Sequence, residues 1–173
     1  MQRRRSVREF RPDPLALDDI AQLLWSAQGV TASGGRRTAP SAGARFPLEL
    51  YLVCQQGLFL YEPSGHALRK IAGGDLRVDL CAAAFGQAFV EQAPVSLVFA
   101  AIYERTTSRY GERGVRYVHM DVGHAGQNVQ LQAEALGLGS CAVGSFDDGA
   151  VAGALNLPQE HEPVYIIPVG RPA

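Results

Sequence analysis

The chain has 173 residues, enough for one domain, residues 1–173, with a sizeable buried core. Charged residues make up 19% of it and the formal net charge is -1, which excludes the strongly basic character of a nucleic-acid-binding protein. No apolar run approaches the roughly 18 to 20 residues that span a bilayer. Cys54, Cys81 and Cys141 lie far apart and lack metal-ligand spacing. We therefore expect a soluble, cytoplasmic protein with reduced thiols and no membrane contact.

Hydrophobic patterns divide the first half of the chain into a helix, a loop and strands. Residues 17–28 place apolar side chains at helical spacing. Residues 29–47 are rich in Gly, Ser, Thr and Pro and predict a long loop of the kind that often carries function. Residues 48–53 predict a strand, and residues 58–61 and 68–71 predict a hairpin.

The second half adds two helices and two strands. Residues 75–89 predict a helix, and the continuous apolar run at 95–102 predicts a strand buried on both faces. Residues 116–136 form the longest helical pattern, which Gly137 ends, and residues 164–169 predict a last strand. This order indicates an α+β fold with a mainly antiparallel or mixed sheet flanked by helices. No GxGxxG turn follows a strand, so a Rossmann domain is not expected.

Basic residues crowd the N-terminus around a serine. Arg4, Ser6 and Arg8 alternate, so an extended segment would point all three the same way, and Arg5 adds a further charge. Guanidinium groups and a hydroxyl are suitable donors for a phosphate dianion. The alternative is a solvated basic tail.

Two further segments consist mostly of small residues. Small side chains at 37–44 and at 137–148 allow the backbone to approach a flat ligand closely. The alternatives are an ordinary flexible loop for the first segment and a helix cap followed by a strand and turn for the second.

Four motifs in register cover nearly the whole chain: RRSVREF, TAPSAGARFPLELYLV, GERGVRYVHMDVGHAGQNVQLQAEALGLGSCAVGSFDD and YIIPVGRP. Together they resemble the nitroreductase family, and within it the SagB-type branch, named for dehydrogenases of thiazole- and oxazole-forming peptide pathways. The resemblance implies a nitroreductase-like fold, non-covalent FMN and an intertwined homodimer with two flavins at the interface.

The resemblance also assigns residues to the flavin. The phosphate and ribityl region would be held by Arg4, Arg5, Ser6, Arg8 and Arg171. The loop reaching the flavin from the other subunit would be Pro40, Ser41, Ala42, Gly43 and Ala44. The strip along the isoalloxazine would be Ala142, Val143, Gly144 and Ser145.

A bound flavin carries the hydride chemistry itself, so no catalytic triad is required. We expect an FMN-dependent oxidoreductase that transfers hydride through flavin N5 in a ping-pong reaction, with NAD(P)H or a small organic substrate as donor. One alternative is a SagB-type dehydrogenase that oxidises an azoline or related heterocycle with oxygen as acceptor. Another is a flavin-binding or storage protein without turnover.

Tyr117 is the one side chain considered for catalysis. The SagB-type resemblance implies a lysine-tyrosine pair that removes a proton, but here Arg116 precedes Tyr117, and arginine is effectively never deprotonated. A structural tyrosine at a helix start is the alternative. His119 and His124 are five residues apart and poorly angled for one ion, so we expect no metal site.

Overall fold

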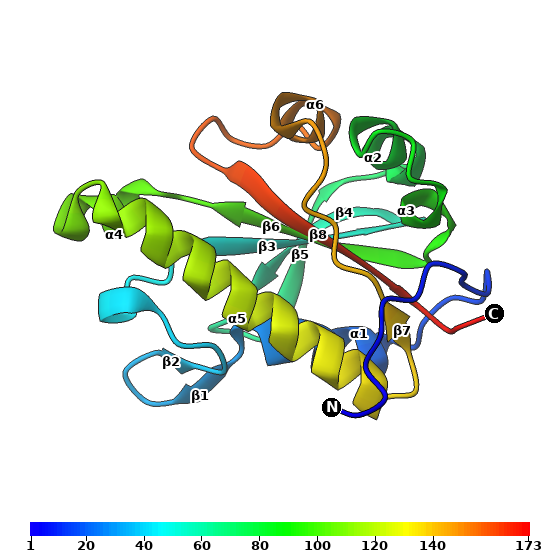
Figure 1. Ribbon diagram of the computed structural model, residues 1–173, viewed down its shortest axis with the longest axis horizontal. Helices are drawn as coiled ribbons and strands as arrows, with labels where there is room; N and C mark the ends of the chain where they lie inside the picture. The colour runs from blue at the N-terminus through cyan, green and yellow to red at the C-terminus, as the bar shows by residue number, and fades with distance from the viewer.

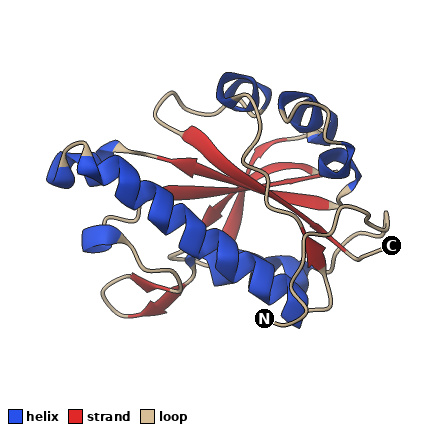
Figure 2. Ribbon diagram, viewed as in Figure 1, coloured by secondary structure: helices blue, strands red, loops and turns tan.

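The computed structural model describes residues 1–173 and contains a six-stranded sheet with helices on both faces (Figures 1 and 2). Its strand order is β5-β4-β3-β6-β8-β7, and every neighbouring pair is antiparallel. In chain order the strands are β3 (Leu48–Cys54), β4 (Gly57–Glu62), β5 (Ala67–Ala72), β6 (Val95–Ala101), β7 (Gly139–Ser140) and β8 (Glu162–Gly170).

Six α-helices and a small ribbon complete the fold. The helices are α1 (Leu17–Gln28), α2 (Arg77–Ala83), α3 (Ala88–Gln92), α4 (Glu104–Tyr110), α5 (Arg113–Ala135) and α6 (Asp148–Ala154). A two-stranded ribbon, β1 (Val30–Ala32) with β2 (Arg36–Arg37), and a 3-10 turn, η1 (Ala42–Ala44), occupy the predicted long loop. No helix has both the length and the apolar character needed to cross a bilayer.

The central strand β6 contributes to two hydrophobic cores, one on each face of the sheet. Leu97 and Phe99 face the core beneath α1 and α5, whereas Val98 and Ala100 face the core beneath α2 and α6. This alternation follows from the two-residue period of a strand, and it explains why the whole run is apolar. The predicted burial of this strand on both faces is confirmed.

The helix predicted over residues 75–89 is wrong as one element. Helix α2 ends at Ala83, and Phe85 and Gly86 then adopt positive φ angles of 56° and 71° before α3 begins. Two successive left-handed residues cannot continue a right-handed helix, so the chain turns there. Helices α4 and α6 were not predicted.

Helix α5 is the longest element, with 23 residues and a length of about 34 Å. It ends where Gly137 takes a φ of 72° and Leu138 donates from its amide to the Ala133 carbonyl at 2.8 Å. Gly126 lets the helix approach β8 closely, because an added Cβ would lie 2.9 Å from the Tyr165 ring. The helix thus crosses the face of the sheet beside β8 (Figure 1).

Candidate functional site

The N-terminal segment lies beside β7 at one edge of the sheet. The Val7 amide donates to the Ser140 carbonyl at 2.9 Å, and Ser6 forms a parallel bridge with Ser140. Next to it, the Arg11 amide donates to the Arg171 carbonyl at 2.9 Å. Three segments that are distant in the sequence therefore meet at this corner, and they carry five of the residues predicted to hold the phosphate.

The guanidinium groups of this corner contact different elements. Arg4 donates from Nη1 to Gln130 Oε1 on α5 at 3.3 Å, whereas Arg8 lies 5.7 Å from the centroid of the Phe89 ring on α3. Arg171 pairs with Asp19 at 3.7 Å. Arg5 and Ser6 are exposed. The corner is rich in cationic donors, although Arg4 and Arg8 do not converge on one point in a single chain.

An open depression of about 310 Å³ lies between α5 and β8. Its walls are formed by His119, Val122, Gly123, Gly144, Val164 and Tyr165. At Gly123 a Cβ would meet nothing within 4 Å, so the helix presents bare backbone there. Burial raises the pKa of Tyr165 above its ordinary value, in line with a phenol largely removed from water.

Of the predicted 142–145 strip, Gly144 lines this depression. Val143 is buried and exchanges two backbone hydrogen bonds with Ile166 of β8, at 2.8 and 3.0 Å. Gly144 and Ser145 are exposed beyond it, and the Ser145 carbonyl accepts from Gln87 Nε2 at 2.9 Å. Hydrogen bonds therefore hold Val143 and Ser145, and the Gly144 backbone between them faces the depression.

The depression and the cationic corner lie along the same face of α5. Gly123 and Gln130 are seven residues apart, which is about two helical turns and about 10 Å of rise. A ligand with a flat ring at one end and an anionic group at the other fits this spacing, and FMN has that shape. The residues present thus fit the expected cofactor.

The 40–44 loop lies elsewhere in the chain. Burial raises the pKa of Asp121, whereas the nearby polar groups of Ser41 and Ala42 lower it, and η1 contacts α5, so the loop lies beside this side chain. Asp121 and Gln130 are nine residues apart, about two and a half turns, so they point to opposite sides of α5. In one chain, the structure does not bring this loop to the segment that carries Arg4.

The loop itself has an unusual backbone. Gly43 and Ala44 have positive φ angles of 59° and 53°, and a Cβ on Gly43 would lie 2.5 Å from the Tyr110 hydroxyl. The Ser41 hydroxyl accepts from the Phe46 amide at 2.8 Å and holds the turn closed. The loop, which begins at the exposed Pro40, therefore has a defined shape and is not an ordinary flexible connection.

Tyr117 lies on the same side of α5 as this loop. Its ring packs edge-to-face on Tyr110 with centroids 5.2 Å apart, and the Arg113 guanidinium lies 5.8 Å from it. Tyr117 does not line the depression of its own chain.

Sequence reasoning missed several polar groups around these segments. The Tyr103 hydroxyl lies 2.8 Å from His119 Nε2 at the rim of the depression, and Asp121 is buried with Oδ2 lacking a hydrogen-bond partner. No three His, Cys, Asp or Glu side chains gather as a metal site. Asp121 could have been found as the one acidic residue on the apolar face of the long helix.

Comparisons with known proteins agree with the resemblance. The profile described as "Nitroreductase family" matches residues 1–171. MJ1384 of Methanocaldococcus jannaschii, a protein whose name describes it as a nitroreductase, is 43% identical over 175 residues. The match covers 98% of this chain and 87% of that protein. The microcin B17-processing protein McbC of Escherichia coli is 29% identical over 157 residues, covering 84% of this chain and 58% of McbC. The chain therefore spans little more than half of that relative.

A crystal structure of a nitroreductase-family protein from Ralstonia eutropha matches with a TM-score of 0.89 and 33% identity, covering 98% of this chain and 80% of that one. The similarity to McbC agrees with the SagB-type branch inferred from the motifs. Members of the family typically bind FMN. The match over residues 1–171 shows that the chain is an oxidoreductase that belongs to the nitroreductase family.

Proposed function

We propose that the chain binds FMN non-covalently between two copies of itself and oxidises or reduces a small organic molecule. The observation that carries the proposal is the placement of the open depression and the cationic corner two turns apart on one face of α5. When bound, FMN would supply hydride transfer through its N5 atom in two successive half-reactions.

Each group of residues has a separate role in this proposal. Arg4, Arg5, Ser6, Arg8 and Arg171 would bind the phosphate and ribityl chain, since fixed guanidinium groups neutralise a dianion. The backbone of Ala142, Val143, Gly144 and Ser145 would support the ring. Tyr165 would keep water from one side of the depression.

The second copy completes the site. Pro40, Ser41, Ala42, Gly43 and Ala44 lie on the opposite side of α5 from the cationic corner, so only the loop of a partner could cover the same flavin. On α5, the apolar side chains of Val115 and Met120 are 40% and 50% exposed, and a partner would cover them. We infer a homodimer with the flavins at the interface.

The donor can be identified by anaerobic stopped-flow absorbance of the FMN-loaded protein. Rapid bleaching by NADPH or NADH would identify a pyridine nucleotide as the donor. Failure of both nucleotides to bleach the flavin within minutes would contradict nucleotide-driven reduction.

A second candidate function is oxidation of a heterocycle in a peptide with oxygen as acceptor, which the similarity to McbC favours. Tyr117 would then move the proton, from a position beside the partner's flavin. Tyr117→Phe should lower azoline oxidation by about 10²-fold or more, the contribution of a positioned acid or base, while FMN content stays unchanged. Tyr110→Phe, which alters the ring packed against Tyr117, is the matched control. Equal losses of azoline oxidation in both variants would show that Tyr117 contributes only through packing.

A further inference from the structure

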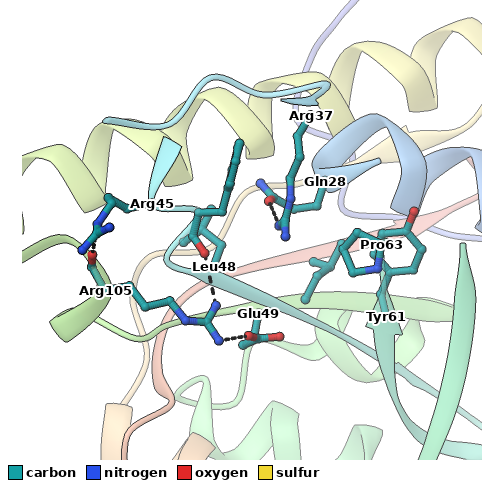
Figure 3. A pocket seen from close by; sticks show the side chains of 10 residues that line it. Gln28, Arg37, Arg45, Leu48, Glu49, Tyr61, Pro63 and Arg105 are labelled. Atoms are coloured by element: carbon teal, nitrogen blue, oxygen red, sulfur yellow. Dashed lines mark hydrogen bonds and ion pairs between the residues drawn. The ribbon is translucent and has the colours of Figure 1, made fainter. Parts of the chain in front are cut away.

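A second cavity, with a volume of about 370 Å³, lies between the end of α1, the loop around Phe46 and strands β3 and β4 (Figure 3). Leu48 and Leu50 of β3 supply apolar walls, and both are buried. Three arginines line it: Arg37, Arg45 and Arg105. None of these residues belongs to the cationic corner or to the depression on α5.

Positive charge exceeds negative charge in this cavity. Glu49 is the only carboxylate in its lining, and its Oε1 accepts from Arg105 Nη2 at 2.6 Å. Arg45 donates to the Arg105 carbonyl instead of to an acid, at 2.9 Å. Arg37 donates only to the neutral Gln28, whose Oε1 lies 2.7 Å from Nη1. Two of the three guanidinium groups therefore have no counterion within the cavity.

Arg37 is held in place before any ligand arrives. Its guanidinium lies 4.5 Å from the centroid of the Phe46 ring, and its partner Gln28 is only 4% exposed. Burial lowers the pKa of Arg37, and the charge of Arg105 lowers it further against the opposing effect of Glu49. An anion beside Arg37 would relieve this unfavourable burial of charge.

The backbone at Phe46 is in the left-handed region, and strained residues of this kind are often found at ligand sites. Its φ is 46°, unusual for an aromatic residue, and two hydrogen bonds hold it: its amide donates to Ser41 Oγ at 2.8 Å and its carbonyl accepts from Arg105 Nη1 at 3.1 Å. The cavity is thereby linked to the turn that contains Ser41.

We propose that this cavity binds a small organic anion, a carboxylate carried on an apolar body, at a site separate from the flavin. The carboxylate would lie against the free nitrogens of Arg37, whose planar fork matches its geometry. The apolar body would lie against Leu48 and Leu50. The cavity volume is within the range of sites for small molecules.

The test is a titration of the purified full-length protein with benzoate, followed by ligand-observed NMR and by the visible spectrum of any bound flavin. Benzyl alcohol has the same ring without the charge, and inorganic phosphate has charge without the ring. Benzoate should bind at least about tenfold more tightly than either, since a charge-assisted pair and an apolar surface both contribute.

Arg37→Gln should weaken benzoate binding by about tenfold or more. Arg36→Gln, which changes the exposed neighbour on β2, should leave binding unchanged. If Arg37→Gln fails to fold, Arg45→Gln tests the same cavity from an exposed position and should weaken binding in the same direction.

Several results would overturn the proposal. They are absence of benzoate binding, equal binding by the Arg36 and Arg37 variants, and tighter binding of phosphate than of benzoate. A change in the flavin spectrum that persists in Arg37→Gln would place benzoate at the flavin and would also overturn it. Because the NMR readout needs no flavin, failure here is distinguishable from failure of the proposed cofactor.

Discussion

Gly139→Ala tests how the N-terminal segment is held against β7. A Cβ at this position would lie 2.7 Å from Val7 Cβ and 2.8 and 2.9 Å from its two methyl groups. Gly139 is not among the glycines with positive φ, so alanine fits its backbone and only the steric clash is introduced. The β-branched Val7 side chain has little rotamer freedom, so the segment itself must move away by about 0.7 Å to reach ordinary contact at 3.4 Å.

The expected cost follows from overpacking of a close contact, about 1–3 kcal/mol of unfolding free energy. For a protein of this size each kcal/mol lowers Tm by about 2–4 °C. The displaced segment carries Arg4 and Ser6, so we also expect FMN to bind about tenfold more weakly. Differential scanning fluorimetry measures the first effect, and fluorescence titration of the flavin-free protein with FMN measures the second.

A second-site variant and a control variant test whether the clash with Val7 causes these effects. Adding Val7→Ala to Gly139→Ala removes the methyl contacts at 2.8 and 2.9 Å but keeps the Cβ contact at 2.7 Å, so it should restore only part of the lost stability and FMN affinity. Gly153→Ala, where a Cβ meets nothing within 4 Å, should leave FMN binding unchanged. If Gly139→Ala has no effect, or if the added Val7→Ala restores none of the lost stability, the packing argument is refuted.

Two further predictions concern carboxylates. Asp75 accepts from the Arg77 amide and guanidinium at 3.1 and 2.8 Å, so Asp75→Ala should cost about 1 kcal/mol at pH 7. The hydrogen bond from Arg77 lowers the pKa of Asp75. The difference in unfolding free energy between the wild-type protein and Asp75→Ala, measured by urea unfolding, should therefore shrink as pH falls through that lowered pKa. A difference that does not change with pH would contradict the role given to the Asp75–Arg77 pair. Burial raises the pKa of Asp121, so its contribution to stability should decline as pH rises above the unfolded carboxyl value of about 3.9 and become constant above the raised pKa. The Asp121→Asn variant should lack this decline. If the stability of the variant and of the wild-type protein changed with pH in the same way, the role given to Asp121 would be wrong.

The long elements could be predicted because their patterns are local. The period of α1 and the continuous apolar run of β6 identify both elements, and the glycine at 137 marks the end of α5. The split between α2 and α3 could not be predicted, because Phe85 adopts a left-handed conformation that its residue type disfavours. The Gly86 amide donates to the Cys81 carbonyl at 2.9 Å and closes the turn, and the pattern of apolar residues in the sequence does not mark this backbone bond.

The segments of the site were predicted from the motifs, and their assignment to two subunits came only from the family resemblance. The motifs named Arg4, Ser41 and Gly144, yet only the structure shows that the segment carrying Ser41 lies on the opposite side of α5 from Arg4. The cavity lined by Arg37 and Arg105 was also missed. These two residues are 68 positions apart in the chain, and no spacing rule connects them.

The central claim is that two copies of the chain enclose FMN, and flavin content measured together with molecular mass tests it most directly. The purified protein, reconstituted with excess FMN and separated from free flavin, is analysed by absorbance and by light scattering in one chromatographic run. The account predicts a dimer that carries about one FMN per chain. A species that retains no flavin, or a monomer that binds FMN as tightly as the dimer does, would contradict it.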